Sequence, residues 1–162
     1  MFKAYATAAT LLLASAFNGV QAADSVVDLP AGLACADFDL RIEITGNPHR
    51  VFRQFTDKNG NVVYLFAGKQ NSLSFTNLNT GATLALRPKG GVERSTYLPD
   101  GSTLATFTGH NVLILFPSDV PAGPTSTLYV GQVTLTIDNT TGVFTLGRTA
   151  GKSVDLCAAL SG

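Results

Sequence analysis

The stretch Ala34–Thr45, ACADFDLRIEIT, decides the fold class of this chain. Its apolar side chains recur at every second position, which is the period of a β-strand with one buried face. They are Phe38, Leu40, Ile42 and Ile44. We therefore predict a strand whose apolar face packs on a core.

Charged side chains fill the alternate positions of the same stretch. They are Asp37, Asp39, Arg41 and Glu43. An Asp-x-Asp spacing of about 6–7 Å on a strand would permit a carboxylate pair for glycoside hydrolysis. A hard cation needs about six oxygen ligands, and the stretch does not cluster so many. The pattern favours a solvated strand face over a catalytic, metal or partner-binding site.

The rest of the chain repeats this pattern of short apolar or alternating segments separated by turns. The segments are Val51–Thr56, Val62–Ala67, Leu73–Leu78, Ala82–Arg87, Val92–Leu98, Thr103–Thr108, Val112–Phe116, Leu128–Asp138, Val143–Leu146 and Val154–Cys157. No window has a helical period, and Cys157–Leu160 has room for one turn. Short connections favour antiparallel pairs. We predict an all-β fold, an antiparallel up-and-down β-barrel of about eight to ten strands, with a β-sandwich as the alternative.

The first residues have the three parts of a secretory signal peptide. Lys3 precedes an apolar run from Ala4 to Phe17, and small residues stand at the two positions that a signal peptidase reads. We expect cleavage after Ala22, or after Ala23, and a single secreted, extracellular domain from residue 23 to residue 162. The alternative is an uncleaved amphipathic anchor.

The charge of the chain is nearly balanced. Without Lys3, ten basic residues stand against eleven acidic ones, and there is no run of Lys and Arg. Nucleic acids and anionic membrane surfaces are recognised by clustered positive charge. The composition therefore predicts neither nucleic acid nor membrane as a partner.

The two cysteines, Cys35 and Cys157, lie near opposite ends of the predicted domain. In an oxidising compartment an even pair indicates one disulfide, with free thiols or an intermolecular bridge as the alternative. A zinc site would be two ligands short, since His49 and His110 lack ligand spacing to either cysteine. The sequence indicates no metal and no cofactor.

Asn139-Thr140-Thr141 is an N-glycosylation sequence on a predicted turn. A glycan on Asn139 would shield a loop tip, which would make the protein a glycoprotein. The alternative is that these residues only suit the turn.

Few residues of the chain suggest a catalytic role. There is no Gly-x-Ser-x-Gly sequence, and a disulfide leaves no cysteine as a nucleophile. His110 has a suitable pKa range for a general base, but a turn or interior role is the simpler interpretation. We predict no catalytic residue. The side chains that could line an interior pocket are Tyr64, Glu93, His110 and Tyr129.

Two predicted strands, Val62–Ala67 and Val112–Phe116, are apolar on both faces. One face of a barrel strand normally meets water, so these two need cover. The N-terminal arm, residues 24–33, could supply it, as could a second copy in a homo-oligomer. The interior could instead hold a small apolar ligand.

Three short motifs carry a resemblance to a known family. They are Cys35-Ala36-Asp37-Phe38-Asp39, Asn77-Leu78-Asn79-Thr80-Gly81 and Val154-Asp155-Leu156-Cys157-Ala158. The chain resembles, from Cys35 to Leu160, a family of small secreted all-β proteins of bacteria and fungi. The resemblance implies a shared terminal cysteine staple and β-fold, and it supplies no activity and no catalytic residue. In barrel layout the chain is also similar to dirigent and allene-oxide-cyclase-like proteins, without their catalytic residues.

These observations together predict a secreted, non-enzymatic binding protein for a small apolar ligand or an extracellular partner. One alternative is a barrel enzyme of the cyclase or isomerase kind, which needs titratable groups that converge in a pocket. Another is a structural, wall-associated protein with a filled interior. An inward-facing Glu93 or Arg94 would indicate a polar interior.

Overall fold

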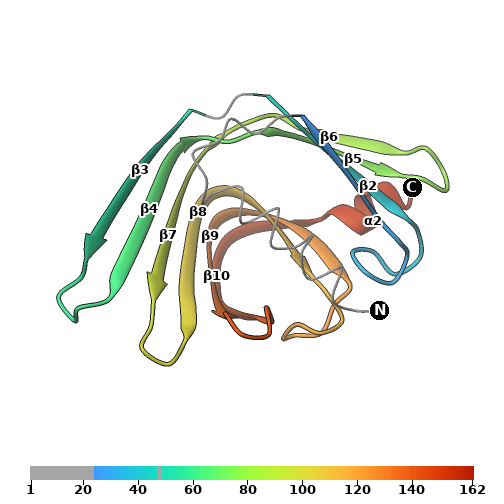
Figure 1. Ribbon diagram of the computed structural model, residues 1–162. Helices are drawn as coiled ribbons and strands as arrows, with labels where there is room; N and C mark the ends of the chain where they lie inside the picture. Colours follow the sequence, from blue (N-terminus) through green and yellow to red (C-terminus); the bar gives the residue numbers. More distant parts are fainter. Residues whose placement is uncertain (1–23, 47–48) are drawn as a thin grey trace.

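The computed structural model describes residues 24–46 and 49–162, and the predicted signal peptide lies outside them. Ten strands and one short helix follow one another along this part of the chain (Figure 1). They are β1 (Ser25–Leu29), β2 (Leu40–Thr45), β3 (Arg50–Thr56), β4 (Val62–Lys69), β5 (Ser72–Asn77), β6 (Thr83–Leu86), β7 (Gly90–Tyr97), β8 (Ser102–Leu115), β9 (Thr125–Asp138), β10 (Phe144–Asp155) and α2 (Leu156–Leu160).

The strands form two antiparallel sheets. The small sheet has the order β1-β2-β5-β6, and the large sheet has the order β10-β9-β8-β7-β4-β3. The all-β prediction is confirmed. Within the described ranges the sheets do not join into a closed barrel, so the sandwich alternative fits as well.

A row of glycines crosses the large sheet and bends it. Directly paired positions on β4, β7, β8, β9 and β10 are Gly68, Gly91, Gly109, Gly131 and Gly151, which we call the glycine row. Four of them have positive φ, and a Cβ on Gly109 would lie 2.4 Å from the Gly90 carbonyl oxygen. Only glycine, which has no Cβ, readily adopts a positive φ and also allows a neighbouring backbone to approach so closely. β8, β9 and β10 therefore curve over as an arch (Figure 1).

The bend explains why Val112–Phe116 is apolar on both faces. Leu113 and Leu115 join Phe107, Val133 and Leu135 in a core inside the arch. Ile114 and Phe116 face the other way and join the core between the arch and the small sheet. The chain itself thus buries four residues of the run, Leu113 to Phe116.

The N-terminal arm provides part of this cover. Residues 25–29 form β1, a strand that the sequence did not indicate, and Leu29 joins the core between the sheets. In the other apolar run, Val63 and Phe66 are buried on opposite faces while Val62 is 36% exposed. A second copy that packs on Val62–Ala67 stays a prediction.

The opening stretch is a strand only from Leu40 onward. Phe38, Leu40 and Ile42 are buried, as the alternation predicts. Arg41 pairs with Asp28 on β1 at 2.7 Å, rather than with the acids of its own segment. Both partners are about half exposed, so the face is a solvated one. β2 lies between β1 and β5 in the small sheet.

The predicted disulfide is confirmed. Cys35 and Cys157 are joined, with 122 residues of sequence separation, and their Cα atoms lie 5.5 Å apart. Cys157 lies on α2, which begins after the N-cap residue Asp155. The bridge ties this helix to the loop before β2. No helix in the described ranges is long and apolar enough to cross a membrane.

Candidate functional site

The strands β3, β4 and β7, which we call the wing, extend beyond the arch and carry the candidate site (Figure 1). Phe52, Phe66 and Glu93 are directly paired neighbours across the wing. Glu93 in turn pairs with Phe107 of the arch core. Paired residues of neighbouring strands point to the same side of a sheet. The inner face of the wing therefore continues the surface that lines the arch.

Aromatic rings cover this inner face. The Phe52 ring lies 4.9 Å from the Phe66 ring and 5.8 Å from the Tyr64 ring, between centroids. Tyr64 meets Tyr97 edge-on at 5.4 Å. Phe52 is 51% exposed and Tyr97 is 37% exposed, although both lie beside buried neighbours. Four neighbouring rings therefore lie on this face, and two of them, Phe52 and Tyr97, are exposed.

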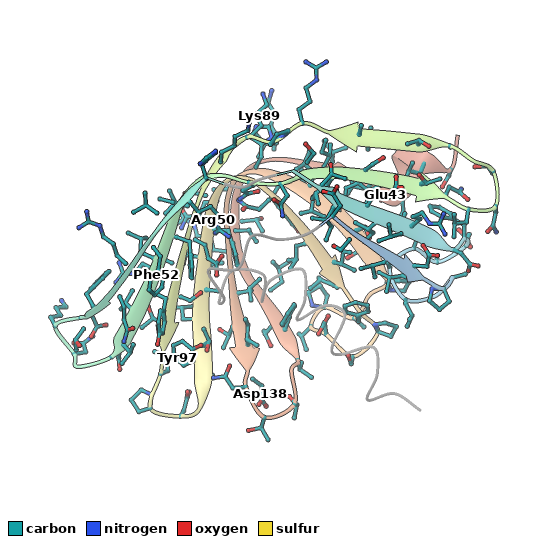
Figure 2. The ribbon with its side chains drawn as sticks, turned by 45° about the horizontal axis from the view of Figure 1, so that its top comes forward. Glu43, Arg50, Phe52, Lys89, Tyr97 and Asp138 are labelled. Atoms are coloured by element: carbon teal, nitrogen blue, oxygen red, sulfur yellow. A yellow bond between two sulfur atoms is a disulfide. The ribbon has the colours of Figure 1, made fainter. Side chains whose placement is uncertain are left out.

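A charged pair lies among these rings. Arg50 Nη2 donates to Glu93 Oε2 at 3.1 Å, and Ser95 Oγ donates to Glu93 Oε1 at 3.3 Å. The two charges come from β3 and β7, which are separated by β4. The Arg50 guanidinium crosses β4 over the Phe66 ring, 5.0 Å from its centroid, and Gly68 opposite Arg50 adds no side chain there. Figure 2 shows Arg50, Phe52 and Tyr97 along the wing.

Burial decides the electrostatics of this pair. It raises the pKa of Glu93, and the hydrogen bond and charge of Arg50 offset only part of that effect. Burial also raises the pKa of Tyr97, with smaller contributions from Tyr64 and from the Glu93 charge. Arg50 Nε is buried and has no hydrogen-bond partner within the described part of the chain. An acceptor oxygen of a ligand would satisfy that N–H group.

The structure brings together two of the four predicted pocket residues. Tyr64 and Glu93 share the inner face on adjacent strands. Tyr129 lies on β9, past the glycine row, where it packs against the arch core. His110 has the opposite orientation and lines a separate cavity between the sheets. Arg94, the neighbour of Glu93, is exposed, so the polar group that faces inward is Glu93.

Sequence reasoning missed Arg50, Phe52 and Phe66 as members of one cluster. Alternation along Arg50–Thr56 does place Arg50 and Phe52 on one face of a strand. Strand pairing places them beside Phe66 and Glu93, and it brings together residues up to 43 positions apart. The alternation within a single strand does not predict this pairing.

The remaining candidates lie outside this cluster. Asn139 is exposed in the turn between β9 and β10, and its Oδ1 accepts from Thr103 Oγ1 at 3.0 Å. Glycosylation of Asn139 stays a prediction. No group of three His, Cys, Asp or Glu side chains in residues 24–46 and 49–162 is arranged to hold a metal ion.

We found no match to this chain among protein-family models, curated proteins or solved structures. Its function is therefore inferred from its own residues.

Proposed function

We propose that the protein is an extracellular binding protein that holds a small apolar ligand against the inner face of the wing. The observation that carries this proposal is the exposed Phe52, with Tyr97 on the same face, beside the part-buried ion pair of Arg50 and Glu93. Covering the exposed Phe52 ring with a ligand would lower the free energy by about 25 cal/mol for each Å² of apolar surface removed from water. Few polar anchors within an apolar surface are typical of small-molecule sites.

The ligand that suits this surface has a flat apolar part and at least one acceptor oxygen. The flat part would lie on Phe52 and Tyr97, and the oxygen would meet the Arg50 Nε–H group. The disulfide between Cys35 and Cys157 supports an oxidising, extracellular location.

A titration with the neutral fluorophore N-phenyl-1-naphthylamine tests the site. The wild-type protein should bind it saturably, with a rise in fluorescence. Phe52→Ala should weaken the affinity about tenfold, because it removes most of one contact ring. Val51→Ala is the matched control, since Val51 is the next residue on the same strand and is 62% exposed on the opposite face. Equal effects of the two variants would contradict the proposal.

The second candidate is an enzyme of the cyclase or isomerase kind, and the observation that favours it is Glu93. A buried carboxyl with a raised pKa beside a tyrosine is a possible proton donor. The variant Glu93→Gln distinguishes the binding protein from the enzyme by the small molecule that each releases. A binding protein should release the same small molecule from wild type and variant, as measured by mass spectrometry after denaturation. An enzyme should release product from the wild type and unconverted substrate from the variant.

A further inference from the structure

A cavity lies where the small sheet meets the arch, away from the wing. Its volume is about 180 Å³, and its apolar wall includes Leu73 of β5, Val112 of β8 and Leu128 of β9. The two linkers that cross from sheet to sheet, β4 to β5 and β6 to β7, form its rim. We call it the seam cavity. Figure 2 shows Lys89, on the second linker, well separated from Phe52 and Tyr97 on the wing.

The charged residues of the seam cavity all have the same sign. Arg87 and Lys89 are exposed at its rim, His110 lies in its wall, and none of its lining residues is an acid. The ion pairs found in the described part of the chain are Asp28–Arg41 and Arg50–Glu93. Neither rim cation is therefore neutralised by a carboxylate there. Two unpaired cations above an apolar wall complement a ligand with an anionic group and an apolar body.

The side-chain amide oxygen of Asn71 indicates a further property of the ligand. Asn71 lines the cavity, and its Oδ1 atom is buried without a hydrogen-bond partner in residues 24–46 and 49–162. Such an acceptor is normally satisfied by a donor. A ligand hydroxyl would supply one. The volume sets the size of the ligand, because a dry cavity of about 150 Å³ holds a benzene ring.

From these observations we propose that the seam cavity binds a small monocarboxylate whose apolar body is about the size of one ring and carries a hydroxyl group. The carboxylate lies between Arg87 and Lys89, the apolar body lies against Val112 and Leu128, and the hydroxyl donates to Asn71 Oδ1. This site is separate from the inner face of the wing and does not depend on the function proposed for it.

The test uses 4-hydroxybenzoate as the probe, titrated into the full secreted protein and followed by NMR of the two histidine rings. The His110 ring signals should shift saturably, while those of His49, which is exposed and outside the cavity lining, should not. Benzoate, which lacks the hydroxyl, should bind about three- to tenfold more weakly. Benzyl alcohol, which lacks the carboxylate, should also bind more weakly.

Four variants locate the binding. Lys89→Gln should weaken the affinity for 4-hydroxybenzoate about threefold, and added salt should reduce that difference. Leu86→Phe enlarges a half-buried lining residue of β6 that pairs with Leu73 and shares its face, so it should reduce the cavity and weaken binding. Lys58→Gln, in the turn between β3 and β4, is the matched control for a lost surface lysine. Phe52→Ala should leave this binding unchanged.

Three results would overturn the proposal. The first is tighter binding of benzyl alcohol than of 4-hydroxybenzoate. The second is an equal loss of affinity in Lys89→Gln and Lys58→Gln. The third is unchanged binding in Leu86→Phe with its fold intact by circular dichroism.

Discussion

Glu93 is the residue on which the electrostatics of the inner face depend. Because burial raises its pKa above the usual value of 4.5, the folded chain holds this proton more tightly than the unfolded chain does. The stability that Glu93 contributes is therefore complete below about pH 4.5 and is lost as the pH rises through the raised pKa.

Replacement of Glu93 by Gln removes this titration. We predict that the wild type gains stability relative to Glu93→Gln when the pH is lowered from about 7 to about 4, as measured by urea unfolding at both pH values. The comparison cancels the turn carboxylates Asp57 and Asp138, whose pKa values are lowered by backbone N–H donors and whose contribution falls in acid equally in both proteins. Glu43→Gln, at a half-exposed acid of the small sheet, is the control. If Glu93→Gln instead gains stability relative to the wild type when the pH is lowered, this account is contradicted.

Asp119 has a structural role that the sequence did not suggest. Its carboxylate is buried and accepts from the backbone N–H groups of Phe116, at 2.6 Å, and Phe144, at 2.9 Å. It thereby joins the loop after β8 to the start of β10. Asp119→Ala leaves both donors without an acceptor, so it should cost about 3 kcal/mol in the free energy of unfolding. Ser118→Ala, at the exposed neighbour, should cost little, and a similar loss in both would contradict the assigned role.

The glycine row acts at the scale of whole strands. A Cβ at Gly109 would lie 2.4 Å from a backbone oxygen, and at Gly131 it would lie 2.2 Å from one, so backbone atoms must move. We predict that Gly109→Ala lowers the free energy of unfolding by more than about 3 kcal/mol. Gly101, with a φ of 84°, has nothing within 4 Å of its Cβ position, so Gly101→Ala should cost only about 1–2 kcal/mol. Equal losses in thermal or urea unfolding would show that the row does not bend the sheet.

The same glycines explain where sequence reasoning succeeded and where it stopped. Alternation around Phe38–Ile44 predicts a strand correctly, because it depends only on neighbouring residues. Gly109 interrupts that pattern, so the sequence predicts two strands where the structure has the single strand β8, and it divides β10 in the same way around Gly151. Glycines with positive φ occur both in turns, as at Gly101, and within a continuous strand, as at Gly109, and the pairing partners distinguish the two cases. Those partners also decide between one barrel and two sheets, which no local pattern reveals.

At the scale of the molecule, the disulfide holds the chain ends of the fold together. It joins residues 122 positions apart and ties α2 to the loop before β2. The loop-entropy model predicts that the double variant Cys35→Ala/Cys157→Ala loses roughly 4–5 kcal/mol of unfolding free energy. Urea unfolding of the wild type and the variant, under oxidising conditions, measures it. A loss below about 1 kcal/mol would mean that the two sheets hold these ends together without the bridge.

The arch therefore has a hydrophobic core on each of its two faces, which provides stability. The wing is less buried and leaves aromatic side chains exposed. The arch core and the core between the sheets account for most of the buried side chains. The wing contributes Phe66 and the Arg50–Glu93 pair, with Phe52 and Tyr97 in contact with solvent. This division between a rigid scaffold and an exposed aromatic surface is the physical basis of the binding function proposed above.

Native mass spectrometry of the purified protein, as isolated and then denatured, tests this claim most directly. The account predicts that the native wild type carries an extra mass that disappears on denaturation, and that Phe52→Ala retains less of it than Val51→Ala does. Native wild-type protein at the bare mass of the disulfide-bonded chain, even after incubation with N-phenyl-1-naphthylamine, would contradict a ligand site on the wing.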